Sequence, residues 1–202
     1  MLAVVDYGAG NVYSVVNALK FIGAECVVTR DAKVIRESDG VILPGVGSFE
    51  HAAVSMKNAG LIEPIKRYIG DGKPFLGICL GMQLLFESSE ESPGVDGLGI
   101  YKGKIVAIPK DMGLKVPHIG WNSLSIQKKD GVFKNVPDGS YVYFVHSYYL
   151  KSEQPENIAA TSDYGVNIHA AIEQDNVFAC QFHPEKSGNV GLDMLRGFVS
   201  IC

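Results

Sequence analysis

An excess of basic residues is missing from this sequence. Its 18 lysines and arginines are outnumbered by 22 aspartates and glutamates, which gives a formal net charge of −4, and no block of lysines and arginines occurs. Proteins that bind nucleic acid usually present a basic patch to the phosphates. The charge balance therefore argues against a nucleic-acid partner.

Long apolar runs are missing as well. A membrane-spanning helix needs about 18 or more consecutive apolar residues, and no segment approaches that length. The first residues, MLAVVDYGAGN, contain no basic segment, and Asp6 interrupts their apolar run, so they do not resemble a secretory signal peptide. We therefore expect a cytoplasmic protein that has no membrane partner.

Cysteine is scarce and scattered. Cys26, Cys79, Cys180 and Cys202 form no CxxC pair, and no group of histidines and cysteines has the spacing of metal ligands. Without an export signal, reduced thiols are the better interpretation. We expect no bound metal and no cofactor.

Apolar residues are abundant, at 47% of the 202 residues, so the chain can bury a substantial core. In the first half, short apolar segments alternate with segments of helical periodicity. Strands are predicted at residues 2–5, 24–29, 40–45 and 74–78, and helices at 12–23, 49–59, 61–70 and 79–87. Continuous apolar strands separated by helices indicate a parallel sheet with helices on both faces.

The second half of the chain has a different pattern, in which strand-like segments follow one another across turns. Strands are predicted at 103–108, 121–127, 140–150, 157–162, 167–173 and 176–182, and a last helix at 189–202. No repeat or linker divides the chain. We expect residues 1–202 to form one α/β domain with an open, mostly parallel sheet and additional antiparallel strands in the second half.

Glycine-rich turns follow the first and third predicted strands, where open parallel sheets bind ligands. DYGAGN (6–11) contains a GxG motif, but Tyr13 occupies the position of a third glycine. A tight turn is therefore a better interpretation than a dinucleotide site. PGVGS (44–48) could direct backbone N–H groups toward a ligand, or could be a plain loop with a helix cap at Ser48.

A cysteine between two glycines follows the fourth predicted strand. The segment GICLG (77–81) matches a nucleophile elbow, which is a sharp turn between a strand and a helix. The N-terminus of a helix favours a thiolate, and the N–H of Leu80 would help to stabilise an oxyanion. A cysteine packed in the core is the alternative, but it leaves Gly77 and Gly81 unexplained. We therefore favour Cys79 as a nucleophile.

A nucleophilic thiol needs a base, and five histidines are candidates: His51, His118, His146, His169 and His183. His51 begins a polar helix and is expected at the surface, and His169 lies in an ordinary strand, where a histidine is more often a satisfied sheet residue. His183 directly follows a strand, and the next residue is a proline that ends the ladder. The carboxylate of Glu185, two residues further on, can orient the imidazole. Cys79, His183 and Glu185 therefore form a predicted catalytic triad.

The three motifs GICLGMQ (77–83), FHPE (182–185) and PGVG (44–47) together resemble those of the class I glutamine amidotransferases, in order and spacing over nearly the whole chain. This resemblance implies a flavodoxin-like sheet. Within the family, a closer resemblance is to the glutaminase subunits of imidazole glycerol phosphate synthases. It is carried by DYGAGN (6–11), PHIGWN (117–122), YFVHSY (143–148) and Lys186.

The resemblance implies a defined chemistry. Cys79 would attack the carboxamide carbon of glutamine, release ammonia and form a thioester that water hydrolyses to glutamate, while His183 moves the proton and Glu185 orients the ring. The oxyanion would be held by the N–H of Leu80 and a backbone N–H of the loop at Val46 and Gly47. A peptide flip, made easy by glycine, would complete this hole.

The resemblance also implies substrate contacts and a partner. The implied contacts with glutamine are Gly47, Gln83, Ser147 and Tyr148, the last two through main-chain groups. The implied partner is a (β/α)8-barrel cyclase subunit in a heterodimer, which receives the ammonia and forms imidazole glycerol phosphate and AICAR. A chain of 202 residues cannot contain that barrel as well, so the cyclase must be a separate chain.

Four further residues are expected at the interface or in gating: Asn11, His118, Trp121 and Lys186. Each also has a structural interpretation, namely a helix cap, a hydrogen-bonded turn histidine, a buried aromatic side chain and a solvated lysine, respectively.

Other functions remain open on the sequence. The protein could be the amidotransferase subunit of an anthranilate, aminodeoxychorismate or pyridoxal phosphate synthase, although PHIGWN (117–122) speaks against these. It could be a non-catalytic regulatory module of the same fold, which the complete triad disfavours. A cysteine peptidase or esterase on a related sheet is a weaker third possibility.

Overall fold

An eight-stranded sheet runs through the molecule, of which the computed structural model describes residues 1–110 and 113–202. Its strand order is β2-β1-β3-β4-β13-β12-β11-β8. Five neighbouring strands are parallel: β2 (Cys26–Thr29), β1 (Leu2–Val5), β3 (Gly40–Gly45), β4 (Phe75–Cys79) and β13 (Val177–Cys180). An antiparallel extension follows: β12 (Asn167–Gln174), β11 (Ile158–Asp163) and β8 (Ser125–Ile126). The predicted fold class, a mostly parallel sheet with antiparallel strands in the second half, is confirmed.

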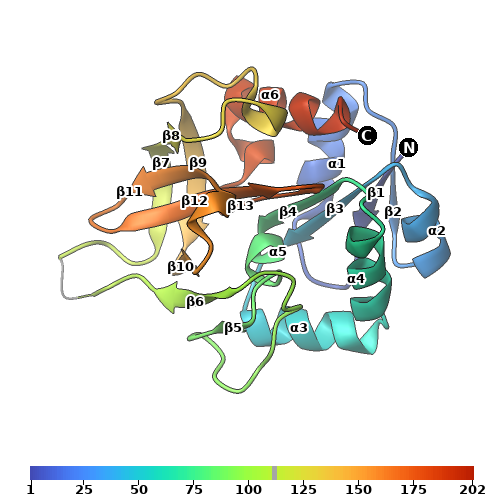
Figure 1. Cartoon of the computed structure of the whole chain (residues 1–202), viewed down its shortest axis with the longest axis horizontal. Coiled ribbons are helices and arrows are strands. Elements are labelled where there is room, and N and C mark those ends of the chain that lie inside the picture. Colours follow the sequence, from blue (N-terminus) through green and yellow to red (C-terminus); the bar gives the residue numbers. More distant parts are fainter. Residues whose placement is uncertain (111–112) are drawn as a thin grey trace.

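Helices cover both faces of the parallel part of the sheet (Figure 1). One face carries α1 (Val12–Phe21) and α6 (Gly188–Val199). The other carries α2 (Ala32–Glu37), α3 (Phe49–Asn58) and α4 (Ile62–Gly70). Among the described residues, none of the helices has the length and apolar character needed to span a bilayer.

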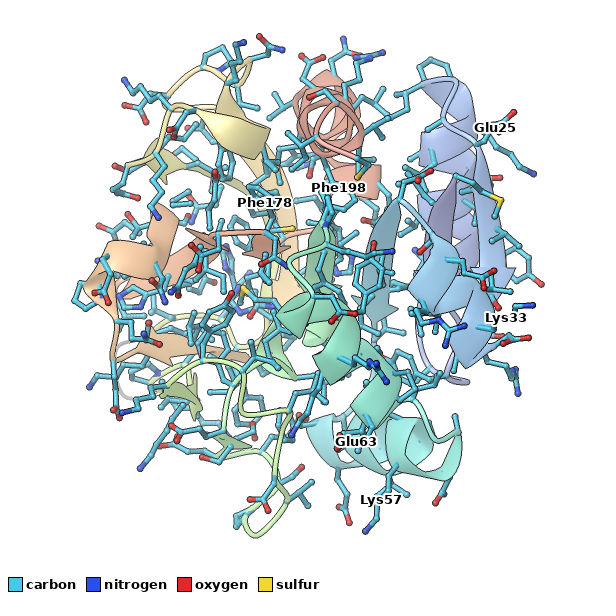
Figure 2. The ribbon with its side chains drawn as sticks, turned by 45° about the vertical axis from the view of Figure 1, so that its right-hand side comes forward. Glu25, Lys33, Lys57, Glu63, Phe178 and Phe198 are labelled. Atoms are coloured by element: carbon cyan, nitrogen blue, oxygen red, sulfur yellow. The ribbon has the colours of Figure 1, made fainter. Side chains whose placement is uncertain are left out.

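Strand β1 illustrates why the parallel strands are continuously apolar. Leu2 and Val4 pack into the core on the α1 and α6 side, whereas Ala3 and Val5 pack into the core on the other side. Because successive side chains of a strand point to opposite faces, both sets are buried only when helices cover both faces. In Figure 2, Phe178 of β13 and Phe198 of α6 meet inside the molecule, and their ring centroids are 6.2 Å apart.

Two smaller sheets stand beside the central one. One pairs β7 (His118–Ser123) with β9 (Tyr141–His146), and the other joins β5 (Ser88–Ser89), β6 (Gly103–Ala107) and β10 (Tyr148–Ser152). The strand predicted at 140–150 is therefore two strands, because the chain leaves one small sheet and enters the other at Ser147. The strand predicted at 121–127 is also divided, between β7 and β8 of the central sheet.

The helix predicted at 79–87 is much shorter than expected. It is α5 (Leu80–Gln83), a single turn. The carbonyl groups of Leu84 and Leu85 accept hydrogen bonds from Leu98 and Ile100, at 2.7 and 2.8 Å, instead of from the next helical turn. The sequence pattern also missed α2, a six-residue helix in which Ile35 is the buried residue. The described residues also include three short 3-10 helices: η1 (Gly131–Phe133), η2 (Pro155–Asn157) and η3 (Pro184–Lys186).

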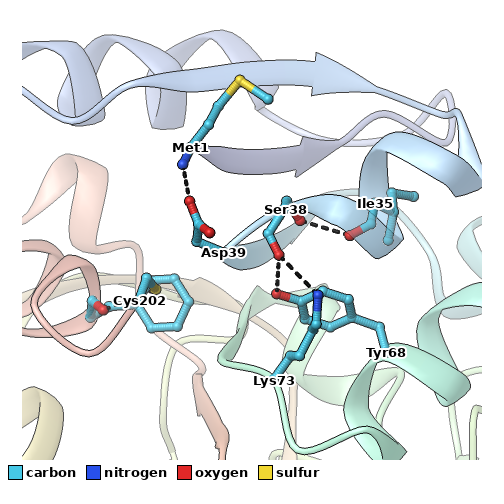
Figure 3. A network of polar contacts seen from close by, with 8 residues as sticks. Met1, Ile35, Ser38, Asp39, Tyr68, Lys73 and Cys202 are labelled. Atoms are coloured by element: carbon cyan, nitrogen blue, oxygen red, sulfur yellow. Dashed lines mark hydrogen bonds and ion pairs between the residues drawn. The ribbon is translucent and has the colours of Figure 1, made fainter.

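At the end of the sheet opposite the candidate site, polar contacts connect the segment between α2 and β3 to its neighbours (Figure 3). Ser38 donates its hydroxyl to the carbonyl of Ile35 at 2.7 Å, and its own carbonyl accepts from the Tyr68 hydroxyl at 3.3 Å. Lys73 also donates to the Ser38 carbonyl, at 3.5 Å. The N-terminal ammonium group pairs with Asp39. Tyr68 and Lys73 thereby supply donors to the Ser38 carbonyl at the end of α2.

Candidate active site

Cys79 lies at the carboxyl edge of the central sheet, where β4 ends and α5 begins. Its neighbour on β3 is Gly45, and Cys180 on β13 pairs with Ile78, so the next residue of that segment, Gln181, follows on the other side. The backbone at Cys79 has φ 55° and ψ −110°. A non-glycine residue rarely adopts such torsions, and they cluster at functional sites. Cys79 is 7% exposed and lines a pocket.

The two glycines of the elbow have a direct steric cause. A Cβ atom added at Gly81 would lie 1.9 Å from the carbonyl oxygen of Leu43 on β3, and one added at Gly77 would lie 2.9 Å from the carbonyl oxygen of Gly81. Strand and helix therefore approach so closely that side chains are excluded. This agrees with the prediction that the glycines serve the turn at Cys79.

His183 and Glu185 form a buried pair next to Cys79. The Nδ1 atom of His183 lies 2.8 Å from Oε1 of Glu185, and both side chains are at most 2% exposed. The other ring nitrogen, Nε2, has no hydrogen-bond partner within the part of the chain that the structure describes. His183 lines the same pocket as Cys79. One ring nitrogen is thus held by a carboxylate, and the other is free to exchange a proton.

The environment of His183 favours its charged form. Burial works against protonation, but the neighbouring Cys79 and Glu185 outweigh it and raise the pKa of the imidazole above its ordinary value of 6.5. Because α5 has only one turn, its dipole can contribute little to a thiolate at Cys79. The protonated imidazole is therefore the main positive charge available to the sulfur.

A pocket of ≈ 440 Å³ opens over the thiol. Most of the predicted site residues line it: Val46, Gly47, Cys79, Leu80, Gln83, Ser147, Tyr148, His183 and Lys186. They come from four segments that are far apart in the sequence and that follow β3, β4, β9 and β13. Glu185 lies behind His183. The fold therefore brings together the residues expected to carry the reaction and those expected to contact substrate.

The remaining predicted residues lie outside this pocket. Trp121 on β7 is 55% exposed, as an interface residue would be, and not a buried aromatic. Asn11 precedes α1, but its side chain makes no capping hydrogen bond. His118 is only 3% exposed and stacks on Tyr164 with ring centroids 3.9 Å apart. His118 therefore offers no surface to a partner, and any part it has in gating is indirect.

Several simpler interpretations of polar residues are confirmed. Ser48 caps α3 and accepts a hydrogen bond from the N–H of His51 at 3.4 Å, while the His51 side chain is exposed. His169 accepts from the N–H of Ser152 at 3.1 Å, as a satisfied sheet histidine. The carboxylate of Asp6 accepts from the N–H of Gly8 at 3.0 Å and so closes the first glycine turn.

Sequence reasoning assigned no role to two polar residues of the site, Gln181 and His146. The side-chain amide of Gln181 donates to the Cys79 sulfur at 3.6 Å, and Gln181 is completely buried. His146 lines the pocket and hydrogen-bonds to His118, with 3.0 Å between the ring nitrogens. Gln181 directly precedes the FHPE motif (182–185), but its place beside Cys79 depends on the pairing of β13 with β4, and no sequence signal pairs the two histidines.

The two paired histidines are neutral. Burial lowers the pKa of His118 to about 4. Burial also lowers the pKa of His146 to about 3, and the hydrogen bond to the Tyr148 carbonyl offsets only part of this effect. A neutral imidazole has one donor and one acceptor nitrogen, so the pair can form a directed hydrogen bond.

The neutral pair makes the fold sensitive to acid. Below pH 6.5 the unfolded chain protonates these histidines, whereas the native protein does so only near pH 4 or lower. The unfolded state therefore binds more protons, and the free energy of unfolding should decrease as pH falls through this window, by up to about 1.4 kcal/mol per pH unit for each histidine. Urea unfolding between these pH values measures the slope. His146→Gln should reduce it, and exposed His51→Gln should leave it unchanged. Equal slopes in all three proteins would contradict a neutral buried pair.

The chemistry of the site is that of acyl transfer. A thiol on a strained turn can attack a carbonyl carbon, and the imidazole–carboxylate pair can accept and return the proton. The N–H of Leu80 begins α5, so it has no partner within the helix and can face an oxyanion. Among residues 1–110 and 113–202, no three His, Cys, Asp or Glu side chains are placed to hold a metal ion.

The sequence matches a family model described as glutamine amidotransferase class-I over residues 3–201. A protein from Caldanaerobacter subterraneus subsp. tengcongensis, described as "Imidazole glycerol phosphate synthase subunit HisH", is 51% identical over 98% of this chain and 97% of its own. One of the same description from Methanothermobacter thermautotrophicus is 50% identical over 100% of this chain and 98% of its own.

Solved structures with much lower identity share the fold. PurLQS from Thermotoga maritima matches with a TM-score of 0.75 at 22% identity, covering 98% of this chain and 97% of that chain. A glutamine amidotransferase from the same organism matches with a TM-score of 0.63 at 16% identity, covering 98% of this chain and 82% of that chain. At these identities the likeness concerns the fold alone.

Proposed function

The chain belongs to the class I glutamine amidotransferase family, and we propose that it is the glutaminase subunit of an imidazole glycerol phosphate synthase, which acts in histidine biosynthesis. It hydrolyses glutamine to glutamate and ammonia. The observation that carries the reaction is the strained Cys79 elbow facing the same pocket as the His183–Glu185 pair. The choice of synthase is supported by sequence identities of 51% and 50% to two such subunits over nearly the whole length.

Cys79 is the proposed nucleophile. Its sulfur attacks the side-chain carboxamide carbon of glutamine, and its proton passes to His183, whose pKa the neighbouring Cys79 and Glu185 raise. The imidazolium returns the proton to the leaving nitrogen, so ammonia departs and a thioester remains. Water, deprotonated by His183, then hydrolyses the thioester. Glu185 keeps the ring in one orientation throughout, through its 2.8 Å contact with Nδ1.

The negative oxygen formed in these steps needs donors. Leu80 supplies one N–H, and a backbone N–H at Val46 or Gly47 supplies the second. Gly45 neighbours Cys79 across the β3–β4 ladder, so the loop begins beside the thiol. Gly47 has φ 99°, which only glycine adopts easily, and Val46 is 39% exposed. A peptide rotation in this loop therefore meets little steric resistance.

Gln83 is suited to the amino end of the substrate. Both of its N–H groups are engaged, with the Tyr148 carbonyl at 3.1 Å and with Gln181 at 2.8 Å. Only its side-chain oxygen remains, and this can accept from an ammonium group. Main-chain groups of Ser147 and Tyr148, which also line the pocket, are the proposed partners for the rest of the amino-acid backbone.

Ammonia released into water would be protonated, so the protein needs an acceptor enzyme next to it. The proposed partner is a (β/α)8-barrel cyclase in a heterodimer, located in the cytoplasm, with no nucleic acid or membrane involved. The exposed aromatic and aliphatic side chains of Trp121 and Ile119 on β7 provide an apolar surface for it. Lys186 lies 5.9 Å from the ring of Tyr143 at the pocket rim, and Asn11 is partly exposed. These residues are proposed interface or gating positions. We further propose that residues 1–202 form a single domain.

A glutaminase assay with and without the cyclase and its nucleotide ligand tests this function. We expect glutamate production to rise when both are added, and Trp121→Ala to weaken that rise. An anthranilate, aminodeoxychorismate or pyridoxal phosphate synthase should have no effect. Stimulation by one of those enzymes, and not by the cyclase, would overturn the assignment.

A further inference from the structure

One backbone carbonyl sets the direction of a buried hydrogen-bond chain that ends at the Cys79 sulfur. The Tyr148 carbonyl oxygen lies 3.1 Å from Nε2 of Gln83 and 2.9 Å from Nδ1 of His146. A carbonyl can only accept hydrogen bonds. Both neighbours must therefore present N–H groups to it, and this decides the orientation of every later member of the chain.

The branch through Gln83 leads to the thiol. Since the amide nitrogen of Gln83 faces Tyr148, its second N–H faces Gln181, at 2.8 Å. Gln181 must therefore accept this hydrogen bond with its side-chain oxygen. Its amide nitrogen, Nε2, then points to Cys79 and lies 3.6 Å from the sulfur. The reversed amide of Gln181 would place two N–H groups against each other and leave the sulfur facing an oxygen. One orientation is therefore strongly preferred.

The second branch, through His146, provides another hydrogen bond to the Tyr148 carbonyl. With Nδ1–H donating to Tyr148, the neutral ring of His146 accepts at Nε2, so His118 donates from Nδ1 at 3.0 Å. His118 is clamped between the rings of Phe144 and Tyr164, with centroids 4.8 and 3.9 Å away. The Tyr148 carbonyl is thereby held by a second donor in addition to Gln83.

We propose that Gln181 is a positioning residue for the nucleophile, held by this chain so that its side-chain amide always donates to the Cys79 sulfur. The inference rests on the proposed role of Cys79. Gln181 is 0% exposed and does not line the pocket, so water does not compete for its side-chain amide. A hydrogen bond to a charged acceptor is stronger than one to a neutral acceptor. The contact therefore stabilises the thiolate more than the thiol. It also restricts rotation of the Cys79 side chain about χ1.

Among the described residues, His183, Tyr7 and Cys180 are the titratable groups coupled to the sulfur, while His146, Glu91 and Lys186 line the same pocket. His183 is the positive partner of Cys79, with Glu185 behind it. Burial raises the pKa values of the Tyr7 hydroxyl and the Cys180 thiol, so both are neutral near pH 7. Gln181 is thus the neutral donor that acts beside the charged His183.

The test measures the rate at which iodoacetamide alkylates Cys79 in the full-length protein, from about pH 5 to about pH 9. Gln181→Met keeps the approximate shape but removes the donor. We expect it to slow alkylation at neutral pH about tenfold and to displace the rate profile toward higher pH. With the cyclase present, kcat for glutamine should fall by a similar factor, and KM should change by less than about twofold. A mere packing role would not move the alkylation profile.

Two further variants sharpen the test. Gln83→Met frees the Gln181 amide to rotate, so it should also slow alkylation, and it should have no added effect when Gln181→Met is already present. Cys180→Ala is the matched control, since this residue is adjacent and buried, and it hydrogen-bonds to the Phe182 carbonyl at 3.4 Å. It should leave the Cys79 rate unchanged. In the Gln181 and Gln83 variants, alkylation of the buried Cys180, measured in the same samples, reports any unfolding.

The outcomes separate this inference from the proposed function. If folded Gln181→Met alkylates as fast as the unaltered protein while that protein hydrolyses glutamine, the positioning role is wrong and the glutaminase assignment stands. If Gln181→Met does not fold, an unchanged rate in Gln83→Met rejects the role instead. If the unaltered protein with its cyclase does not hydrolyse glutamine, the proposed function itself fails.

Discussion

Replacing Cys79 with alanine is expected to abolish glutamine-dependent synthesis by the complex while synthesis from added ammonia persists. No other side chain can form the thioester here, because Cys79 is the one thiol among the described residues that line the pocket. Loss of a covalent nucleophile typically lowers turnover by a factor of about a thousand or more. Two assays on the reconstituted complex measure the effect, one with glutamine and one with an ammonium salt at a pH that supplies free ammonia.

The control for this substitution is Cys202→Ala, which removes an exposed thiol at the C-terminus and should change neither assay. Equal loss of both activities in the Cys79 variant would mean that the substitution damages assembly and not catalysis. Retention of glutamine-dependent synthesis would exclude the thioester mechanism. It would instead favour a regulatory module that has kept the triad residues without using them.

Gly81→Ala is expected to have the largest effect on stability among single methyl additions at the site. The new Cβ would lie 1.9 Å from the Leu43 carbonyl oxygen, a backbone atom of a central strand that cannot move aside like a flexible side chain. Either β3 and α5 separate or the elbow distorts. We expect the free energy of unfolding to fall by about 3 kcal/mol. Urea unfolding measures this, and the folded fraction should also lose glutaminase turnover, because Cys79 is displaced.

The matched control is Gly70→Ala, at the exposed end of α4. An added Cβ there meets nothing within 4 Å, and the residue does not need a positive φ. Since alanine is the better helix former, this variant should be as stable as the unaltered protein or more stable, by less than about 1 kcal/mol. Equal stabilities for the two variants would show that the close approach of strand and helix is not what requires Gly81.

Much of the fold and half of the site can be predicted from local sequence, because the causes are local. Continuous apolar segments such as residues 40–45 require burial on both faces, and that requirement predicts the parallel sheet and its covering helices. The Gly–x–Cys–x–Gly pattern by itself predicts a turn too tight for side chains at its two glycines. The close approach of Gly81 to the Leu43 carbonyl is the steric reason for this. The His183–Glu185 pair is equally local, since its members are neighbours on either side of one proline.

Other features depend on which distant segments become neighbours. The switch between sheets at Ser147 follows from the separate pairing of β9 with β7 and of β10 with β6, which an apolar run at 140–150 does not reveal. Gln181 acquires its place only because β13 lies beside β4, about a hundred residues away in sequence. The direction of its amide depends on a still more distant group, the Tyr148 carbonyl. Side-chain type and spacing can predict the nucleophile and its base, but strand order and packing decide which donors surround the sulfur.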